Sequence, residues 1–143
     1  MSGPKNTLSL YSTTSVLTAS KPKIVWLLLE GAIRRLQRAQ IAFEIDDIGR
    51  RNEQIHNCCD RSVQIVAELK WALDLDGGGE FSKTMFGLYG FIEESIRNGN
   101  VRKDPAPLKR AEELLSGIFT AWDEMLKKSN AKPKASGPLN LHS

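Results

Sequence analysis

The sequence predicts an all-α protein: an antiparallel four-helix bundle with a flexible N-terminal segment and a disordered C-terminal tail. Three observations support this prediction. Apolar residues recur at alternating three- and four-residue spacing in four separate segments, which is typical of helices that each bury one stripe. Short clusters of Asp, Gly and Asn separate these segments, and no run alternates polar and apolar residues as a half-buried strand does. Short connections between helices of similar length favour antiparallel neighbours.

The first helix is expected from about Ser20, a favourable N-cap, to Ile45. Its predicted buried stripe consists of Val25, Leu29, Ala32, Leu36, Ala39 and Phe43. Trp26 and Ile33 lie about 80–100° off this stripe at 3.6 residues per turn, and Leu27 lies near the opposite side. Because a second apolar face needs a second partner to cover it, this helix predicts a protein that binds another molecule.

The second helix is expected to start after Asp46 and Asp47, because a carboxylate there accepts amide hydrogen bonds and faces the positive end of the helix dipole. The three consecutive glycines 77–79 favour a turn and are expected to end it. Its predicted stripe consists of Ile48, Ile55, Cys59, Ser62, Val66, Leu69 and Leu73.

The third helix is expected over about 81–97, followed by a turn at Asn98-Gly99-Asn100. Asp104 followed by Pro105 has the favoured order of cap and first helical residue and opens the fourth helix. The third stripe consists of Phe81, Met85, Leu88, Ile92 and Ser95 or Ile96. The fourth consists of Leu108, Ala111, Leu115, Ile118, Trp122 and Met125.

Composition sets the domain organisation and the partner class. Residues 1–10 are expected to be a flexible N-terminus, residues 11–128 one helical domain, and residues 129–143 a disordered tail rich in Ser, Pro, Asn and Gly. The net charge of +3 comes from basic residues that are spread along the chain and interleaved with acidic ones, which indicates no nucleic-acid partner.

No apolar run approaches the roughly 18 residues of a membrane span, and no secretory signal is visible. The two cysteines are adjacent and build no disulfide framework. A cytoplasmic protein without membrane insertion is therefore expected.

No catalytic, cofactor-binding or metal-ligating residue is predicted. The segment 77–84, GGGEFSKT, mimics a phosphate-binding loop, but Ser82 stands where the last glycine belongs and no strand precedes it. His56, Cys58 and Cys59 are too few for a closed zinc site. Adjacent carboxylates on a helix point about 100° apart and do not converge on a substrate. These pairs are Glu93-Glu94 and Glu112-Glu113.

Gly31 lies inside the first helix, where glycine costs about 1 kcal/mol relative to alanine. Two explanations remain open. Gly31 can allow close packing against another helix of the same bundle, or it can form a shallow notch for a partner helix.

Several short motifs, in this order and spacing, resemble the flagellar secretion chaperone family (FliS). The resemblance covers about residues 11–126. The residues that carry it are Tyr11, Val16-Leu17-Thr18-Ala19-Ser20, Leu28-Leu29-Glu30-Gly31-Ala32, Asp47-Ile48, Ile65-Val66-Ala67-Glu68-Leu69, Leu73-Asp74, Gly78-Gly79, Leu88-Tyr89-Gly90-Phe91, Asp104 and Ala121-Trp122.

The resemblance implies a cytoplasmic, non-enzymatic export chaperone. Its partner would be the C-terminal segment of flagellin, kept unpolymerised and delivered through the complex to the flagellar export gate. The resemblance gives Tyr11 a capping role over the binding groove. The predicted partner-binding residues are Tyr11, Val16, Leu17, Trp26, Leu27, Gly31, Ile33, Ile65 and Trp71. Weak self-association of the free protein is expected where an apolar face is uncovered.

Two other classes remain as alternatives to an export chaperone. One is a helical adaptor or signalling module that docks on another protein. The other is a small helical enzyme whose site the sequence does not reveal. Copurification with flagellin distinguishes the chaperone from the adaptor, and assays for hydrolysis and metal content address the enzyme.

Overall fold

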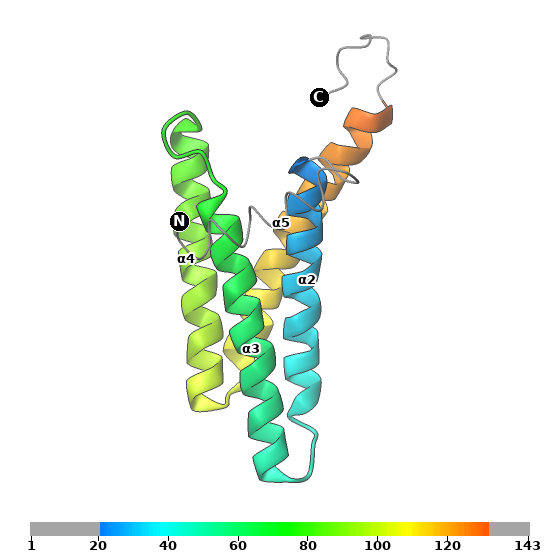
Figure 1. The fold of residues 1–143 in the computed structure, drawn as a ribbon, viewed down its shortest axis with the longest axis vertical. Coiled ribbons are helices and arrows are strands. Elements are labelled where there is room, and N and C mark those ends of the chain that lie inside the picture. Colours follow the sequence, from blue (N-terminus) through cyan, green and yellow to red (C-terminus); the bar gives the residue numbers. More distant parts are fainter. Residues whose placement is uncertain (1–20, 132–143) are drawn as a thin grey trace.

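The computed structural model describes residues 21–131, which form four helices. In chain order these are α2 (Lys21–Ala42), α3 (Ile48–Trp71), α4 (Gly79–Arg102) and α5 (Pro105–Ala131). Consecutive helices run antiparallel, and each of α2 and α4 packs between α3 and α5 (Figure 1). The predicted all-α four-helix bundle is confirmed, and residues 21–131 contain no strand.

The predicted boundaries agree with the structure in part. The Ser20 cap, the segment 1–10 and most of the tail lie outside the described residues. The last helix continues to Ala131, beyond the boundary predicted at residue 128. Within the described part of the chain, no helix combines the length and the apolar character that crossing a bilayer requires.

Local side-chain chemistry starts α3 where the sequence predicts it. Asp47 has an extended backbone, and its Oδ2 accepts a hydrogen bond from the amide of Arg50 at 2.8 Å. Asp104 acts in the same way at the start of α5, where its Oδ1 accepts from the amide of Ala106 at 3.0 Å. Both caps use an aspartate carboxylate to satisfy an amide that has no partner within the helix.

Gly77 and Gly78 lie in the turn between α3 and α4, and Gly79 is the first residue of α4. The predicted turn is confirmed, although α3 already ends at Trp71. The Gly78 amide donates to the Asp74 carbonyl at 2.7 Å. A β-carbon on Gly78 would lie 2.5 Å from that same backbone oxygen, so no side chain fits there. Gly79 has φ of +61°, a conformation that glycine adopts at little cost.

The predicted turn at Asn98-Gly99-Asn100 is wrong, because these residues lie inside α4. The left-handed residue that ends the helix is Lys103, with φ of 52°. Its Nζ donates to the carbonyl and side-chain oxygens of Asn100, both at 2.7 Å, and so caps the last turn. Gly99 serves packing instead: a β-carbon there would lie 2.6 Å from Cδ2 of Leu108 in α5.

The core follows the predicted stripes through the middle of each helix. The buried apolar residues are Ile24, Leu28, Leu29, Ala32, Leu36, Ala39, Ala42, Ile55, Cys58, Cys59, Ile65, Val66, Leu69, Tyr89, Ile92, Ile96, Leu108, Ala111 and Leu115. The buried face of α2 differs from the predicted stripe in two ways. Ile24, Leu28 and Ala42 are buried although they lie outside that stripe, and Val25 and Phe43 are only partly buried.

Three residues assigned to the core are exposed instead. They are Ile48, Phe81 and Met125, and each lies within about two turns of a helix end. The apolar spacing continues there, but the end of a helix projects beyond its neighbours, so no second helix covers it. Figure 1 shows this for the C-terminal part of α5, which extends past the start of α2.

Two polar contacts lie between helices in the interior. The Ser62 hydroxyl donates to the Ala32 carbonyl at 3.2 Å, which satisfies a fully buried side chain. Lys70 of α3 pairs with Glu93 of α4 at 2.6 Å, with side-chain exposures of 19% and 6%. Lys70 Nζ also lies 5.2 Å from the centre of the Phe86 ring.

Candidate partner-binding surface

Aromatic side chains concentrate at the end of the bundle where α2 begins, α3 ends, α4 begins and α5 ends. We call this the aromatic end. On α2 and α5 it carries Trp26, Phe119, Trp122 and Met125; near the α3–α4 turn it carries Trp71, Leu75 and Phe81. In Figure 1 the α3–α4 pair and the α2–α5 pair lean apart at this end.

Trp26 connects α2 to α5. Its Nε1 donates to Oδ1 of Asp123 at 2.8 Å, and its ring lies 5.2 Å from that of Phe119 at an angle of 49°. Lys23 Nζ lies 3.9 Å from the ring centre on the same helix. The Trp26 hydrogen bond, followed by that of Lys127, lowers the pKa of the Asp123 carboxyl. Trp26 therefore has a structural role, and its predicted role as a partner anchor remains a prediction.

Trp122 makes the reciprocal contact from α5 to α2. Its Nε1 donates to the carbonyl of Pro22 at 2.9 Å. This carbonyl belongs to the first turn of α2. The two indoles thus hold the start of α2 against α5 while both rings stay partly exposed. Partly exposed aromatic rings whose polar atoms are already satisfied are well suited to apolar contact with a partner.

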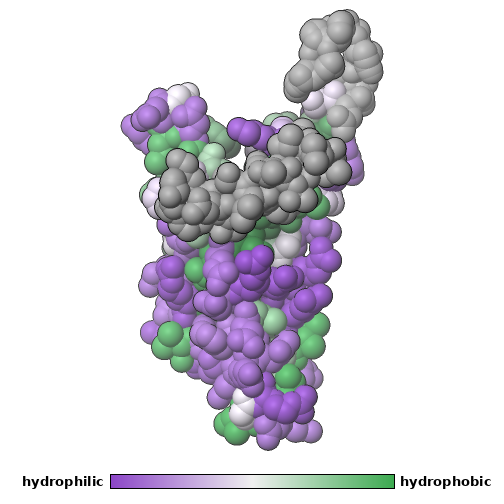
Figure 2. All heavy atoms as spheres, viewed as in Figure 1, coloured by the Kyte–Doolittle hydropathy of each residue, from purple (hydrophilic) through white to green (hydrophobic). Residues whose placement is uncertain are grey.

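The α3–α4 side of the aromatic end is more open. Trp71 is 61% exposed, Phe81 is 65% exposed, and Leu75 in the turn between them is 42% exposed. In Figure 2 a group of apolar residues lies just below the hydrophilic tip of the α3–α4 pair, and the middle of the visible surface is mainly hydrophilic. Large exposed apolar side chains that lie together on a folded domain indicate an interaction site.

The other predicted site residues are less exposed. Leu27 and Ile33 are partly buried, and Ile33 packs against the core. Ile65 is buried, at the contact between α3 and α2. Tyr11, Val16 and Leu17 lie outside the described residues. Partner binding by these residues remains a prediction.

Leu75, Phe81, Phe119 and Met125 are not among the binding residues that the sequence predicts. The spacing of Phe81 and Met125 predicts core positions, whereas both side chains are exposed. Their position near helix ends was the available signal, because a stripe that continues to the end of a bundle has no neighbour to cover it. Phe119 carried no such signal, since its contact with Trp26 joins residues far apart in the sequence.

Gly31 packs against α3, which supports the first of its two explanations. A β-carbon on Gly31 would lie 3.6 Å from Cδ1 of Ile65, an ordinary van der Waals distance. We expect Gly31→Ala to fit without strain and to raise the free energy of unfolding by about 0.5–1 kcal/mol, because alanine favours the helix. Urea titration followed by circular dichroism measures this. A loss of stability would show that the helices cannot accept the methyl group.

Cys58 and Cys59 are free, buried thiols, and residues 21–131 also contain other side chains of the types that bind metals. Burial raises the pKa of the Cys59 thiol to about 12 and also raises that of Cys58, so both thiols stay protonated at neutral pH. Within residues 21–131, His, Cys, Asp and Glu side chains nowhere gather in a group that could hold a metal ion. Glu112 accepts hydrogen bonds from Gln37 and Gln40 and so joins α5 to α2.

Comparison with known proteins places the chain in a family. The family model described as flagellar protein FliS matches residues 4–129. The flagellar secretion chaperone FliS of Vibrio cholerae is 31% identical over 126 residues, 87% of this chain and 90% of that relative. The flagellar secretion chaperones FliS of Salmonella typhimurium and Bacillus subtilis are 29% identical to this chain over 136 residues and 24% identical over 135 residues, respectively. These alignments cover 94% of this chain in both cases, and 93% and 97% of the respective relatives. The chain belongs to the FliS family of flagellar secretion chaperones.

Proposed function

We propose that this chain is a cytoplasmic chaperone that binds the C-terminal segment of flagellin at its aromatic end. Bound there, flagellin stays unpolymerised and is delivered to the flagellar export gate. The observation that carries the proposal is the exposure of Trp71 and Phe81 beside the α3–α4 turn. Family membership supports a flagellar partner.

The chemistry of the aromatic end suits an amphipathic segment that is disordered alone. Such a segment pays an ordering cost when it binds, which apolar anchors must exceed. Tryptophan and phenylalanine are efficient anchors because they bury a large area and lose few rotatable bonds. Trp26 and Trp122 extend the same surface across α2 and α5. In this proposal Tyr11, Val16, Leu17, Leu27 and Ile33 contribute further apolar contact.

Calorimetric titration with a peptide from the flagellin C-terminus tests the proposal. We expect saturable binding at a ratio of one to one. The double variant Trp71→Glu with Phe81→Glu should weaken this binding at least tenfold, because anchor residues typically contribute more than 1 kcal/mol each.

Val101→Glu is the matched control. Val101 is also apolar and is 81% exposed, but it lies at the other end of α4. It should leave the affinity unchanged. An equal loss in both variants, or no binding by the unchanged protein, would contradict the proposal.

A further inference from the structure

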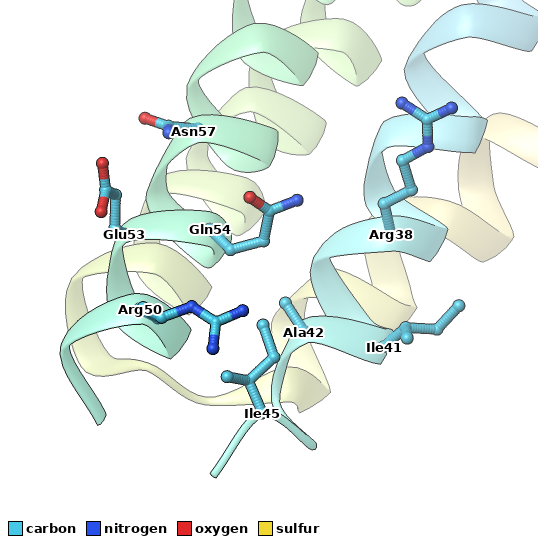
Figure 3. A pocket seen from close by; sticks show the side chains of 8 residues that line it. All are labelled: Arg38, Ile41, Ala42, Ile45, Arg50, Glu53, Gln54 and Asn57. Atoms are coloured by element: carbon cyan, nitrogen blue, oxygen red, sulfur yellow. The ribbon is translucent and has the colours of Figure 1, made fainter. Parts of the chain in front are cut away.

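A groove lies at the end of the bundle opposite the aromatic end, between the last turns of α2 and the first turns of α3. Its volume is about 580 Å³, and its apolar residues are Ile41, Ala42 and Ile45. Arg38 of α2 and Arg50 of α3 line it from the two sides. We call it the distal groove. In Figure 3 the side chains of Arg50 and Gln54 point into the gap toward α2, whereas the Glu53 carboxylate points away.

Neither arginine of the groove forms an ion pair within the described part of the chain. Among residues 21–131, no carboxylate lies within ion-pair distance of the side chain of Arg38 or Arg50. Two other arginines on these helices have partners: Arg34 pairs with Glu30 at 3.1 Å, and Arg51 donates to the Ile45 carbonyl at 3.0 Å. Glu53 also lines the groove, but its carboxylate points away from the gap, so both guanidinium groups can bind a carboxylate of a ligand.

Arg50 also stands at a position where the helix itself favours the opposite charge. It is the third residue of α3, and the Asp47 cap accepts a hydrogen bond from its amide. Glutamate or glutamine commonly occupies this position, because its side chain completes a capping box. A cation there opposes the positive end of the helix dipole. A residue that breaks a local rule without a structural gain is a candidate for function.

We propose that the distal groove docks an acidic, amphipathic segment of a second protein, separate from the partner held at the aromatic end. Aliphatic side chains of that segment pack on the partly exposed Ile45, and its carboxylates pair with Arg38 and Arg50. Guanidinium groups bind carboxylates through two parallel hydrogen bonds, which fixes the segment in place. A nucleic acid fits the groove less well, because binding its phosphates requires a longer stripe of basic residues than Arg38 and Arg50 provide.

The two surfaces are well separated. Gln54 of the distal groove and Trp71 of the aromatic end lie on the same helix. At 1.5 Å per residue they are about 25 Å apart along α3. Both surfaces can therefore be occupied at once by different segments.

The test uses a synthetic helical peptide with leucines along one face and glutamates on both flanks, labelled for fluorescence anisotropy. We expect it to bind the full chain, and the same peptide with glutamine in place of glutamate to bind at least tenfold more weakly. Arg38→Glu with Arg50→Glu should also weaken binding of the acidic peptide at least tenfold. Both side chains are exposed, and glutamate at position 50 suits the capping position, so thermal stability should not fall.

Arg97→Glu with Arg110→Glu makes the same change in net charge on exposed positions outside the groove. It should leave peptide affinity within about twofold of the unchanged protein, since the contact is local. Three outcomes would overturn the proposal: no binding of the acidic peptide, an equal loss in both double variants, or displacement of the acidic peptide by the flagellin peptide. The last outcome would assign the groove to the flagellin surface and leave the proposed function intact.

Discussion

Replacing Lys70 by Met, with Glu93 retained, is expected to lower the free energy of unfolding by about 3 kcal/mol or more. The pair joins α3 to α4 at 2.6 Å, and the Glu93 side chain is only 6% exposed. Without Lys70 the carboxylate remains in the interior with no countercharge, and burial of an unpaired charge is costly. Chemical denaturation of the single variant measures the loss.

Removing the other partner of the pair, by Glu93→Leu, should lower the free energy of unfolding by a smaller amount. Lys70 is 19% exposed, and its flexible stem can carry the ammonium group to water. The double variant Lys70→Met with Glu93→Leu should lie close to the unchanged protein, because an apolar pair of similar volume often replaces a buried ion pair without loss. If Lys70→Met alone were neutral, Glu93 would have to be solvated in a way that its burial does not indicate.

Features determined by neighbouring residues could be predicted from the sequence. Asp47 and Asp104 cap their helices through amides two or three residues ahead, and the glycines 77–79 turn the chain through their own backbone. In each case the signal and its structural consequence lie within a few residues. The apolar stripes through the middle of the helices were predictable for the same reason, since their period is fixed by helix geometry.

Features that depend on distant residues could not be predicted in this way. Gly99 resembles a turn glycine until Leu108 of the next helix is found against it. The hydrogen bond from Trp26 to Asp123 joins residues 97 positions apart, so the sequence around Trp26 does not predict it. Phe81 continues an apolar stripe, and only the length of the neighbouring helices shows that it is uncovered.

The candidate site therefore combines predicted and unexpected parts. The prediction that the chain carries apolar side chains beyond its core agrees with the exposure of Trp71. The predicted binding residues lie before the first helix, on that helix and on the second one, and their role in binding remains a prediction. The exposed side chains of Leu75, Phe81 and Met125 add residues from the α3–α4 turn, α4 and α5 to the candidate surface. Periodicity identifies which helix positions are apolar, but the ends of the bundle decide which of them remain available to a partner.

Replacing Leu36 by Glu is expected to unfold the bundle. Leu36 lies in the middle of α2 and has no exposed surface. The change removes a buried leucine side chain, which costs about 2–5 kcal/mol by itself, and places a charge where no partner is available. The sum approaches the whole stability of an ordinary domain, about 5–15 kcal/mol. Circular dichroism at neutral pH should show a loss of helical signal or a much lower melting temperature.

Ile41→Glu provides the matched control, because it makes the same kind of change on the same helix at a side chain that is 69% exposed. It should shift the free energy of unfolding by no more than about 0.5 kcal/mol. Trp26→Glu should fall between the two, since it breaks the contact with Asp123 and Phe119 at one end of the bundle but leaves the central core intact. Equal destabilisation by Leu36→Glu and Ile41→Glu would contradict the division of α2 into a buried and an exposed face. Full unfolding by Trp26→Glu would mean that the aromatic end is required for the fold itself, and binding would then have to be tested with Trp71 and Phe81 alone.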